Sequence, residues 1–372
     1  MDGIKVKTVD KATLDMFKKR LYVPKNAEEW IERYNREIAL GEKTADEILS
    51  DMKQVYQNSL AELNKEIEAF YGRYAKENGI TLAEAHKRLD PGELKSAREE
   101  MMRFYKFADP ERVGKDRSVA FRTELRELGA RKYLSRLEEI KVRMKYILAR
   151  LAAKEKSVYE KALSAEYKEA QQMAYYAIAK DVGFFVDFAS PSEQIILKAL
   201  EQKWVGANYS DTIWENKGKL LQALEKDFMT GLALGQNPKK IAKAMSKDFG
   251  LEYKKCERVA RTEAIHIMNE VTADSYVANG IEKCQFVADL SERTCDKCGD
   301  MDGQIVNVKY RVIGVDYPPL HPACRCSTVP YYDDDLSKLF GNATRIAKDS
   351  GGKVIDVPAD MTWAQWKEEY GK

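Results

Sequence analysis

The sequence predicts a mainly α protein, in which an extended helical N-terminal part is followed by a small α+β module rich in cysteine. Two observations carry this prediction. Over the first two thirds of the chain, apolar residues recur every three or four positions, which is the period of an amphipathic helix. After Gly280 the period shortens to two, as in a half-buried strand, and five of the six cysteines follow.

Helix starts in the first part are marked by capping boxes, in which a Ser, Thr or Asp precedes a Glu by three residues. Four such signals occur, beginning at Thr44, Thr81, Asp90 and Ser190. Residues 106–116 predict a loop between helical segments. Residues 118–180 contain no proline and one glycine, so they predict either one very long helix or two helices with a short break.

The stretch from 194 to 280 is predicted to be helical as well. The sequence Gly-Gln-Asn-Pro at 235–238 ends one helix and starts another, with Asn237 as the N-cap. A helix from about Tyr253 to Gly280 carries Arg-Thr-Glu-Ala at 261–264. Because Arg261 and Glu263 point to different faces of this helix, we expect each to tie it to a neighbour. His266 is isolated, and we interpret it as structural.

Beyond Gly280 the alternation predicts three short strands, at 284–288, 304–309 and 326–331, with a turn at Asp302-Gly303. Cys284 and the helical Cys256 are interpreted as core residues. In the tail, Thr362 opens a capping box with Gln365. The residues Trp363, Trp366 and Tyr370 then share one helical face, which predicts docking on the chain's own body or on a partner.

A cluster of potential metal ligands follows the first strand. It consists of a Cys-x-x-Cys pair and a His-Pro-x-Cys-Arg-Cys run, with donors at Cys295, Cys298, His321, Cys324 and Cys326. Zn²⁺ takes four Cys or His ligands in two short-range pairs, so the spacing predicts a structural zinc ion in a zinc-ribbon-like or knuckle-like module. We expect Cys295, Cys298 and His321 to bind, with one of Cys324 or Cys326 as the fourth ligand. Thiols without a metal and disulfides are the alternatives, and disulfides are disfavoured because the opening residues contain no signal peptide.

Charge is abundant but balanced over the chain, at 33% charged residues and a net charge of +2. The segment from Arg112 to Lys156 departs from this balance, with 14 Lys and Arg against 6 Asp and Glu. Such a segment either neutralises phosphates or forms a solvated helix face. The candidate nucleic-acid contacts are Arg131, Lys132, Arg136, Lys141, Arg143 and Lys145. No apolar run reaches the length of a membrane span, so we expect no membrane partner.

Several motifs occur in a fixed order: an Arg-Thr-Glu-Ala helix, Arg293-Thr-Cys-x-x-Cys298, Met301-Asp-Gly303, and Pro318-Pro-x-His-Pro-x-Cys-Arg-Cys326. From about Trp204 to Tyr332, this order resembles the head-morphogenesis or minor capsid proteins of tailed bacteriophages, the Mu F-type family, in the branch from siphophages of Gram-positive hosts. The resemblance implies three domains: an elongated helical domain at 1–190, a head-morphogenesis domain at 191–332 with its Cys/His cluster at 284–332, and a tail at 333–372.

The resemblance also implies a role. Members of this family are low-copy virion proteins inside the head near the portal vertex, and they act in head assembly, DNA packaging or DNA delivery. The implied partners are the portal protein and the major capsid or scaffolding protein, with packaged double-stranded DNA as a further partner. The protein would be in the host cytoplasm during assembly. The resemblance implies no catalytic activity. Some relatives carry an ADP-ribosyltransferase or similar toxin domain after the Cys/His region, but 46 residues follow Cys326, so we expect none here.

Two other functions compete with this prediction. In the first, a metal-dependent nuclease or hydrolase acting during packaging, the carboxylates near the cluster bind a divalent ion or activate water together with His321. These carboxylates are Asp289, Glu292, Asp300 and Asp302. In the second, the knuckle reads DNA bases, but the basic residues around it are balanced by aspartates, which disfavours a phosphate-facing surface. We therefore expect a structural protein and not an enzyme.

Overall fold

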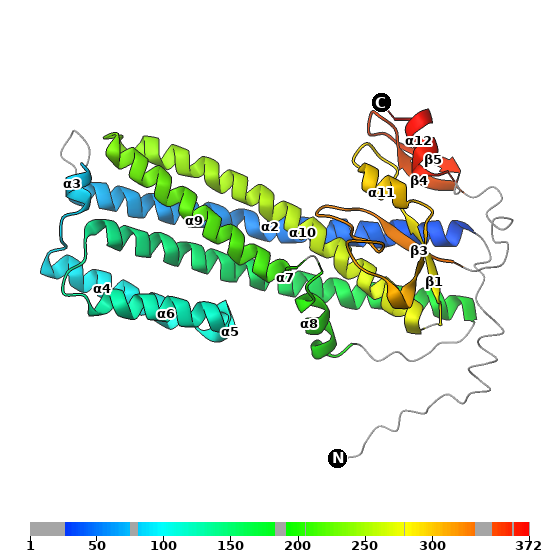
Figure 1. The fold of residues 1–372 in the computed structure, drawn as a ribbon, viewed down its shortest axis with the longest axis horizontal. Helices are drawn as coiled ribbons and strands as arrows, with labels where there is room; N and C mark the ends of the chain where they lie inside the picture. Colours follow the sequence, from blue (N-terminus) through cyan, green and yellow to red (C-terminus); the bar gives the residue numbers. More distant parts are fainter. Residues whose placement is uncertain are drawn as a thin grey trace, which may run out of the picture. The chain divides into compact units, whose positions relative to one another are not determined.

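The computed structural model describes residues 27–74, 81–182, 191–204, 206–278, 280–331, 344–358 and 361–371. It confirms a mainly α protein with a small antiparallel sheet near the C-terminus (Figure 1). The chain divides into two compact units. The bundle unit comprises residues 45–162 and 201–260, and the knuckle unit comprises residues 1–44, 163–200 and 261–372. The predicted three-domain division follows chain order instead and stays a prediction.

Three helices are far longer than the average helix of a globular protein. They are α2 (Ala27–Tyr74), α7 (Arg136–Val182) and α10 (Pro238–Ala278), and each is divided between the two units. The bundle unit adds α3 (Leu82–Ala85), α4 (Pro91–Phe107), α5 (Pro110–Val113), α6 (Lys115–Ala130) and α9 (Tyr209–Ala233).

Aromatic side chains join the helices of the bundle unit. Phe70 of α2 meets Phe228 of α9 at 5.2 Å between ring centroids. Tyr159 of α7 stacks on Tyr209 of α9, and Phe104 of α4 stacks on Tyr146 of α7. Large rings that are buried and offset in this way contribute both area and a preferred geometry, so they hold the helices at defined positions.

A buried ion cluster lies within the same unit. The Lys217 ammonium is 2.7 Å from a Glu155 carboxylate oxygen and 2.8 Å from a Glu252 oxygen, and all three side chains are at most 3% exposed. The Tyr56 hydroxyl donates to Glu155. Burial and the Glu155 carboxylate raise the pKa of Tyr56 well above its usual value. Because charges taken from water are costly unless each is paired, this cluster ties α2, α7, α9 and α10 into one register.

The predicted helix boundaries are correct in part. Asp90 forms a full capping box, and Thr81 accepts a hydrogen bond from the Glu84 backbone N–H. Asn237 accepts from the Lys240 N–H at the start of α10. The stretch 118–180 contains two helices, since α6 ends at Ala130 and α7 begins at Arg136. The Ser190 signal lies outside the described residues.

Three boundary predictions are wrong. Thr44 starts no helix, because α2 continues through it with Leu40, Ile48 and Met52 buried along one face. Nor does a helix begin near Tyr253, since α10 starts at Pro238. The predicted loop at 106–116 contains the short helix α5. In the first two cases a continuing apolar face outweighs a local signal. The helix α5 instead starts at a local signal that the prediction overlooked, the Asp109 cap followed by Pro110.

The knuckle unit contains α8 (Glu193–Glu201) and the small sheet. Its strands β1 (Lys283–Val287), β2 (Ile305–Asn307) and β3 (Ser327–Tyr331) are antiparallel in the order β2-β1-β3. A second sheet pairs β4 (Thr344–Lys348) with β5 (Val354–Pro358). The remaining elements are α11 (Asp296–Met301), the 3-10 turn η1 (Val308–Tyr310) and α12 (Trp363–Glu369). As predicted, Cys284, Phe286 and Ala288 form the buried face of the first strand.

The aromatic tail helix docks on the chain's own body, which is one of the two predicted alternatives. Trp363 and Trp366 are buried with Leu290, Ala347 and Val357. Within the described residues, no helix combines the length and the apolar character that crossing a membrane requires.

Candidate metal centre

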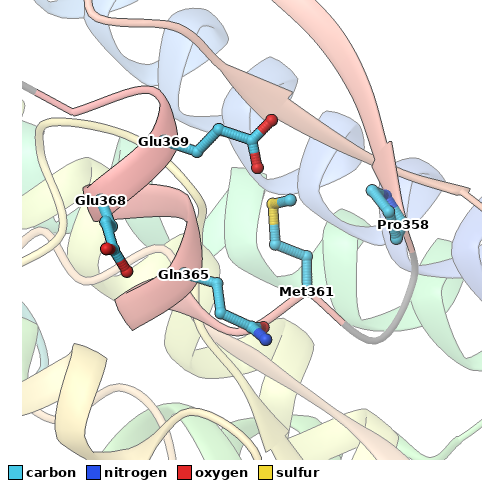
Figure 2. A pocket seen from close by; sticks show the side chains of 5 residues that line it. All are labelled: Pro358, Met361, Gln365, Glu368 and Glu369. Atoms are coloured by element: carbon cyan, nitrogen blue, oxygen red, sulfur yellow. The ribbon is translucent and has the colours of Figure 1, made fainter.

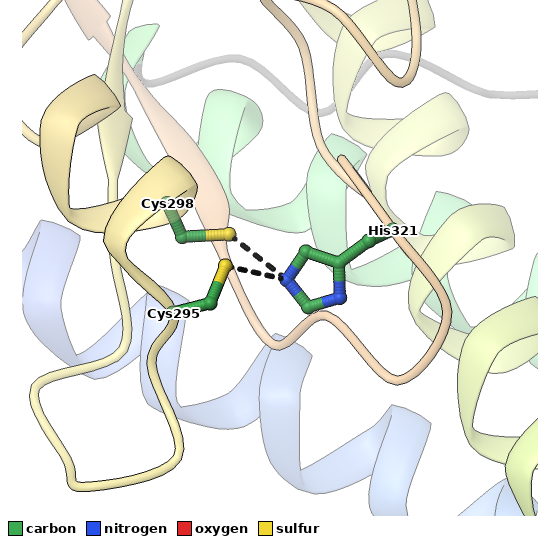
Figure 3. A group of neighbouring side chains, drawn as sticks. All are labelled: Cys295, Cys298 and His321. Atoms are coloured by element: carbon green, nitrogen blue, oxygen red, sulfur yellow. Dashed lines mark hydrogen bonds between the residues drawn. The ribbon is translucent and has the colours of Figure 1, made fainter.

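The five predicted donors come from two segments that the small sheet brings together. Cys295 is the N-cap residue of α11, and Cys298 lies one turn into that helix. His321, Cys324 and Cys326 lie on the loop that leads into β3. Figure 3 shows the sulfur atoms of Cys295 and Cys298 pointing at the same ring nitrogen of His321.

The donor atoms form two overlapping trios. Cys295, Cys298 and His321 make one, and Cys298, Cys324 and Cys326 make the other, with all donor atoms of a trio within 4.8 Å of one another. Each sulfur of the first trio is 3.2 Å from His321 Nε2, and the Cys298 and Cys324 sulfurs are 3.7 Å apart. Two sulfurs on one tetrahedral zinc ion, with bonds of about 2.3 Å, lie about 3.8 Å apart. The spacing therefore fits a metal bound between them.

The histidine presents the correct nitrogen. His321 Nδ1 lies 2.8 Å from the Pro322 carbonyl oxygen, which accepts a hydrogen bond from the Nδ1–H. The other nitrogen, Nε2, is then an acceptor that faces the two sulfurs. Ligating histidines are commonly held in this way, because a bond at one ring nitrogen fixes the tautomer and orientation of the other.

The thiols of the second trio are buried together, with Cys298, Cys324 and Cys326 each at most 2% exposed. Hydrogen bonds from Cys298 and Cys326 lower the pKa of the Cys324 thiol. The pKa of the Cys298 thiol is raised, mainly because it donates to Cys324, and the pKa of Cys326 is raised by its bonds to Cys298 and Cys324. These three thiols are close enough to affect one another's ionisation, and a divalent cation bound among them would neutralise several thiolates at once.

The tail holds the helix that carries the first pair. A Cβ built on Gly299 would lie 2.1 Å from Trp363 Cε3, so the indole ring rests directly on the backbone of α11. Lys367 lies over the same ring and pairs with Asp296 at 3.2 Å. These contacts fix α11 and, with it, the direction of Cys298.

Two carboxylates of the predicted enzyme site, on Asp289 and Asp302, have structural partners. One oxygen of Asp302 accepts from the Ala288 N–H at 2.8 Å, and the other accepts from the Trp363 N–H at 2.7 Å. Asp289 accepts from the Ser291 hydroxyl. None of the predicted carboxylates joins either donor trio in the described part of the chain. Asp302 therefore joins the end of β1 to the start of α12.

His266 is buried on α10, where burial lowers its pKa to about 3. It belongs to neither trio among the described residues, as its interpretation as structural expects. Cys256 and Cys284 are buried core residues, also as predicted.

An open hollow of about 480 Å³ lies on the tail, and Figure 2 shows the side chains that line it. They are Pro358, Met361, Gln365, Glu368 and Glu369. The Gln365 side-chain oxygen accepts from the Thr362 N–H at 2.8 Å, so it serves the helix cap. Among the described residues, the side chains that line this hollow form no group of three metal ligands.

Most of the predicted nucleic-acid residues are neutralised inside the bundle unit. Their carboxylate pairs are Arg131–Glu138 (2.6 Å), Arg136–Glu84 and Arg136–Glu93 (3.6 Å each), Lys141–Glu225 (3.8 Å), Arg143–Glu139 (2.9 Å) and Lys145–Glu124. Lys132 lies over the Tyr133 ring. Three of these carboxylates, on Glu84, Glu93 and Glu225, lie outside the segment from Arg112 to Lys156, so the local charge count overstates the positive field.

Sequence reasoning missed the residues that support the site. From the sequence, Asp302 is assigned to a competing active site. Arg325 lies between Cys324 and Cys326 and pairs with Glu42, which lies on α2, far away in the sequence. The Arg-Thr-Glu-Ala motif was the one available signal, because Thr262 and Arg261 both contact the ligand loop or its partner.

The arrangement gathers four thiols and one imidazole into two overlapping groups at metal-binding distances, beside the long helix α10. Comparison with known proteins agrees with the predicted resemblance. Residues 222–329 match the family described as Phage Mu protein F like protein, so this segment of the chain is similar to that family.

A curated relative is more distant. The NAD(+)–arginine ADP-ribosyltransferase EFV of Enterococcus faecalis is 24% identical over 207 residues, which cover 50% of this chain and 41% of the relative. The chain thus spans about two fifths of that relative's length. No solved structure matches the chain.

Proposed function

We propose that this chain is a minor structural protein of a tailed-phage head, in which one Zn²⁺ ion holds the knuckle unit in shape. The observation that carries the proposal is the convergence of all five Cys/His donors within the segment that matches the phage Mu F-like family. The site is lined by thiols and one imidazole, and its three innermost sulfurs are buried. Closed sites of this composition are structural, whereas catalytic zinc sites keep an open position.

The ion would be held by Cys298 together with three of Cys295, His321, Cys324 and Cys326. A bound Zn²⁺ supplies positive charge that stabilises thiolates and cross-links α11 to the loop before β3. The protein's own residues orient the donors, since Pro322 fixes the imidazole tautomer and Trp363 fixes α11.

In the assembled particle we place the protein inside the head near the portal vertex, with the portal protein and the major capsid or scaffolding protein as partners. Quantitative mass spectrometry of purified phage particles from a strain carrying this gene tests this location. A few copies per particle are expected. Absence from mature particles would contradict a virion role and leave a transient assembly factor, present only in the host cytoplasm.

Packaged DNA has less support as a partner, because five of the six candidate basic residues pair with carboxylates. We expect purified protein to bind duplex DNA weakly, with a shallow dependence on salt. A steep loss of binding between low and physiological salt would restore the basic segment as a DNA contact.

The proposed role is not enzymatic. The name of the curated relative describes ADP-ribosyl transfer, and we propose that this chain shares that protein's non-catalytic part. Incubation with labelled NAD⁺ and an arginine-containing acceptor should transfer no label. In the same way, plasmid DNA should stay intact with Mg²⁺, Mn²⁺ or Zn²⁺, and cleavage that is lost in Asp302→Ala but kept in Cys295→Ser would favour a nuclease.

A further inference from the structure

We propose that Thr262 of α10 is a positioning residue for the metal site, holding the turn between His321 and Cys324 in the conformation that binds. This inference rests on the proposed metal centre and assigns a role to the Arg-Thr-Glu-Ala motif. The Thr262 hydroxyl accepts a hydrogen bond from the Ala323 N–H at 2.7 Å, and the threonine is 4% exposed.

The residue that donates this hydrogen bond, Ala323, has a strained backbone conformation. Ala323 has a φ of +60°, a left-handed conformation that residues with a Cβ adopt at a cost in free energy. It lies directly before Cys324, whose N–H donates to the His321 carbonyl at 3.1 Å. If Ala323 relaxed to a negative φ, this turn would open and two donors would move apart. The bond from α10 opposes that relaxation.

A second connection holds the next residue along the loop. Arg325 lies between the two cysteines of the loop, and its Nε is 3.3 Å from a carboxylate oxygen of Glu42. The other oxygen of Glu42 forms a close ion pair with Arg261, the neighbour of Thr262. A cavity of only about 10 Å³ remains among these side chains, so the loop has little room to shift.

The same helix contacts the loop a third time. Asn269 lies seven residues after Thr262, and side chains at that spacing share one face of a helix. Its amide donates to the Cys326 carbonyl at 3.2 Å. One face of α10 therefore contacts the backbone just before Cys324 and again at Cys326. A loop preformed in this way loses less conformational freedom when metal binds.

The test is metal affinity in the full-length protein, measured with Zn²⁺ by chelator competition and with Co²⁺ by its visible absorption. Thr262→Val keeps the shape of the side chain but removes the acceptor, and it should weaken binding by about 10- to 100-fold, the usual effect of losing an outer-shell partner. The Co²⁺ bands should shift as the ligand geometry loosens. Thr262→Ser keeps a hydroxyl and should restore both readouts. Thr272→Val, at another buried threonine of α10, is the matched control and should leave both unchanged.

Each outcome has a distinct meaning. Wild-type affinity and an unchanged Co²⁺ spectrum in Thr262→Val would overturn the positioning role and leave the metal centre intact. Failure of the wild-type protein to bind either ion would overturn the metal centre and the positioning role with it. If Thr262→Val does not fold, Glu42→Gln decides, since it weakens both ion pairs at a partly exposed position. Reduced affinity in that variant supports positioning of the loop by α10, and unchanged affinity contradicts it.

Discussion

The bundle unit and the knuckle unit bury different kinds of side chain. The bundle unit packs large aromatic rings from several long helices around a paired ion cluster. In the knuckle unit, the core beneath β1 has six buried residues, and three of them are cysteines. Cysteines thus make up half of the residues in this cluster, which is too small to be stabilised by apolar area alone. We infer that the bundle unit is stable through packing, whereas the knuckle unit depends on what its thiols bind.

The largest difference in stability between the two units is expected when the cysteine shared by both donor trios is removed. Cys298 belongs to both donor trios, so Cys298→Ser should abolish stoichiometric zinc binding, and structural zinc contributes on the order of 10 kcal/mol to folding in small modules. Elemental analysis should show the loss of zinc. Hydrogen exchange should show lost protection in β1 and β3, with the bundle helices unaffected. Cys256→Ser is the control, because this cysteine is buried in the bundle unit away from the donors. Retention of one zinc ion per chain by Cys298→Ser would refute the shared-ligand role.

The bundle unit should be destabilised by a substitution in its buried ion cluster. Lys217→Met removes the ammonium between two buried carboxylates, and breaking a buried ion pair costs about 3–5 kcal/mol. Urea unfolding followed by circular dichroism should report this loss, while zinc content stays at the wild-type level. Lys219→Met removes an exposed pair two residues away and should change stability by less than about 0.5 kcal/mol. Equal midpoints for the two variants would show that the buried cluster is not stabilising.

Acid should affect the knuckle unit through His266. Burial lowers the pKa of His266 to about 3, from a value near 6.5 in the unfolded chain. Between these two pH values the unfolded state binds a proton that the folded state does not. The stability therefore falls as the pH falls, by about 1.4 kcal/mol per pH unit for this one group. Unfolding measured from pH 7 to pH 4 should show a slope that is shallower by one proton in His266→Gln. An identical slope in that variant would assign the acid sensitivity to other groups.

The smallest difference in stability between the two units is expected for alanine substitutions at two glycines. Gly299→Ala places a Cβ against the Trp363 ring and should destabilise the knuckle unit by about 1–3 kcal/mol. Gly218→Ala, in α9 of the bundle unit, meets nothing within 4 Å and should stabilise its helix by about 0.5–1 kcal/mol. Thermal unfolding of the two variants gives the signs directly. A Gly299→Ala protein as stable as the wild type would show that the tail helix can move away from α11.

Features that depend only on residues close together in the sequence were predictable from the sequence. The caps at Asp90 and Asn237, the alternating strand from Cys284 and the five donors are all properties of short stretches. The failures concern long-range contacts. Thr44 has the sequence of a helix start, yet the apolar face of α2 passes through it.

Long-range contacts also determine how the basic segment is paired. Arg143 has its closest acid on its own helix, but Glu66 of α2 also lies 3.3 Å away. Glu42 meets Arg261 across 219 positions of sequence. No local pattern encodes such pairs, because they exist only once the helices have packed. The support of the loop before β3 was therefore not predictable, although the grouping of the five Cys and His side chains was.

The closeness of the Cys298 and Cys324 sulfurs has a consequence for handling the protein. At 3.7 Å apart in a shared thiol group, these side chains are placed for an oxidant to remove two hydrogens and join them as a disulfide. That bond would consume two donors at once and would prevent later loading with metal. Protein purified with chelators in air should accordingly become refractory to zinc, and a reductant added before the metal should reverse the damage.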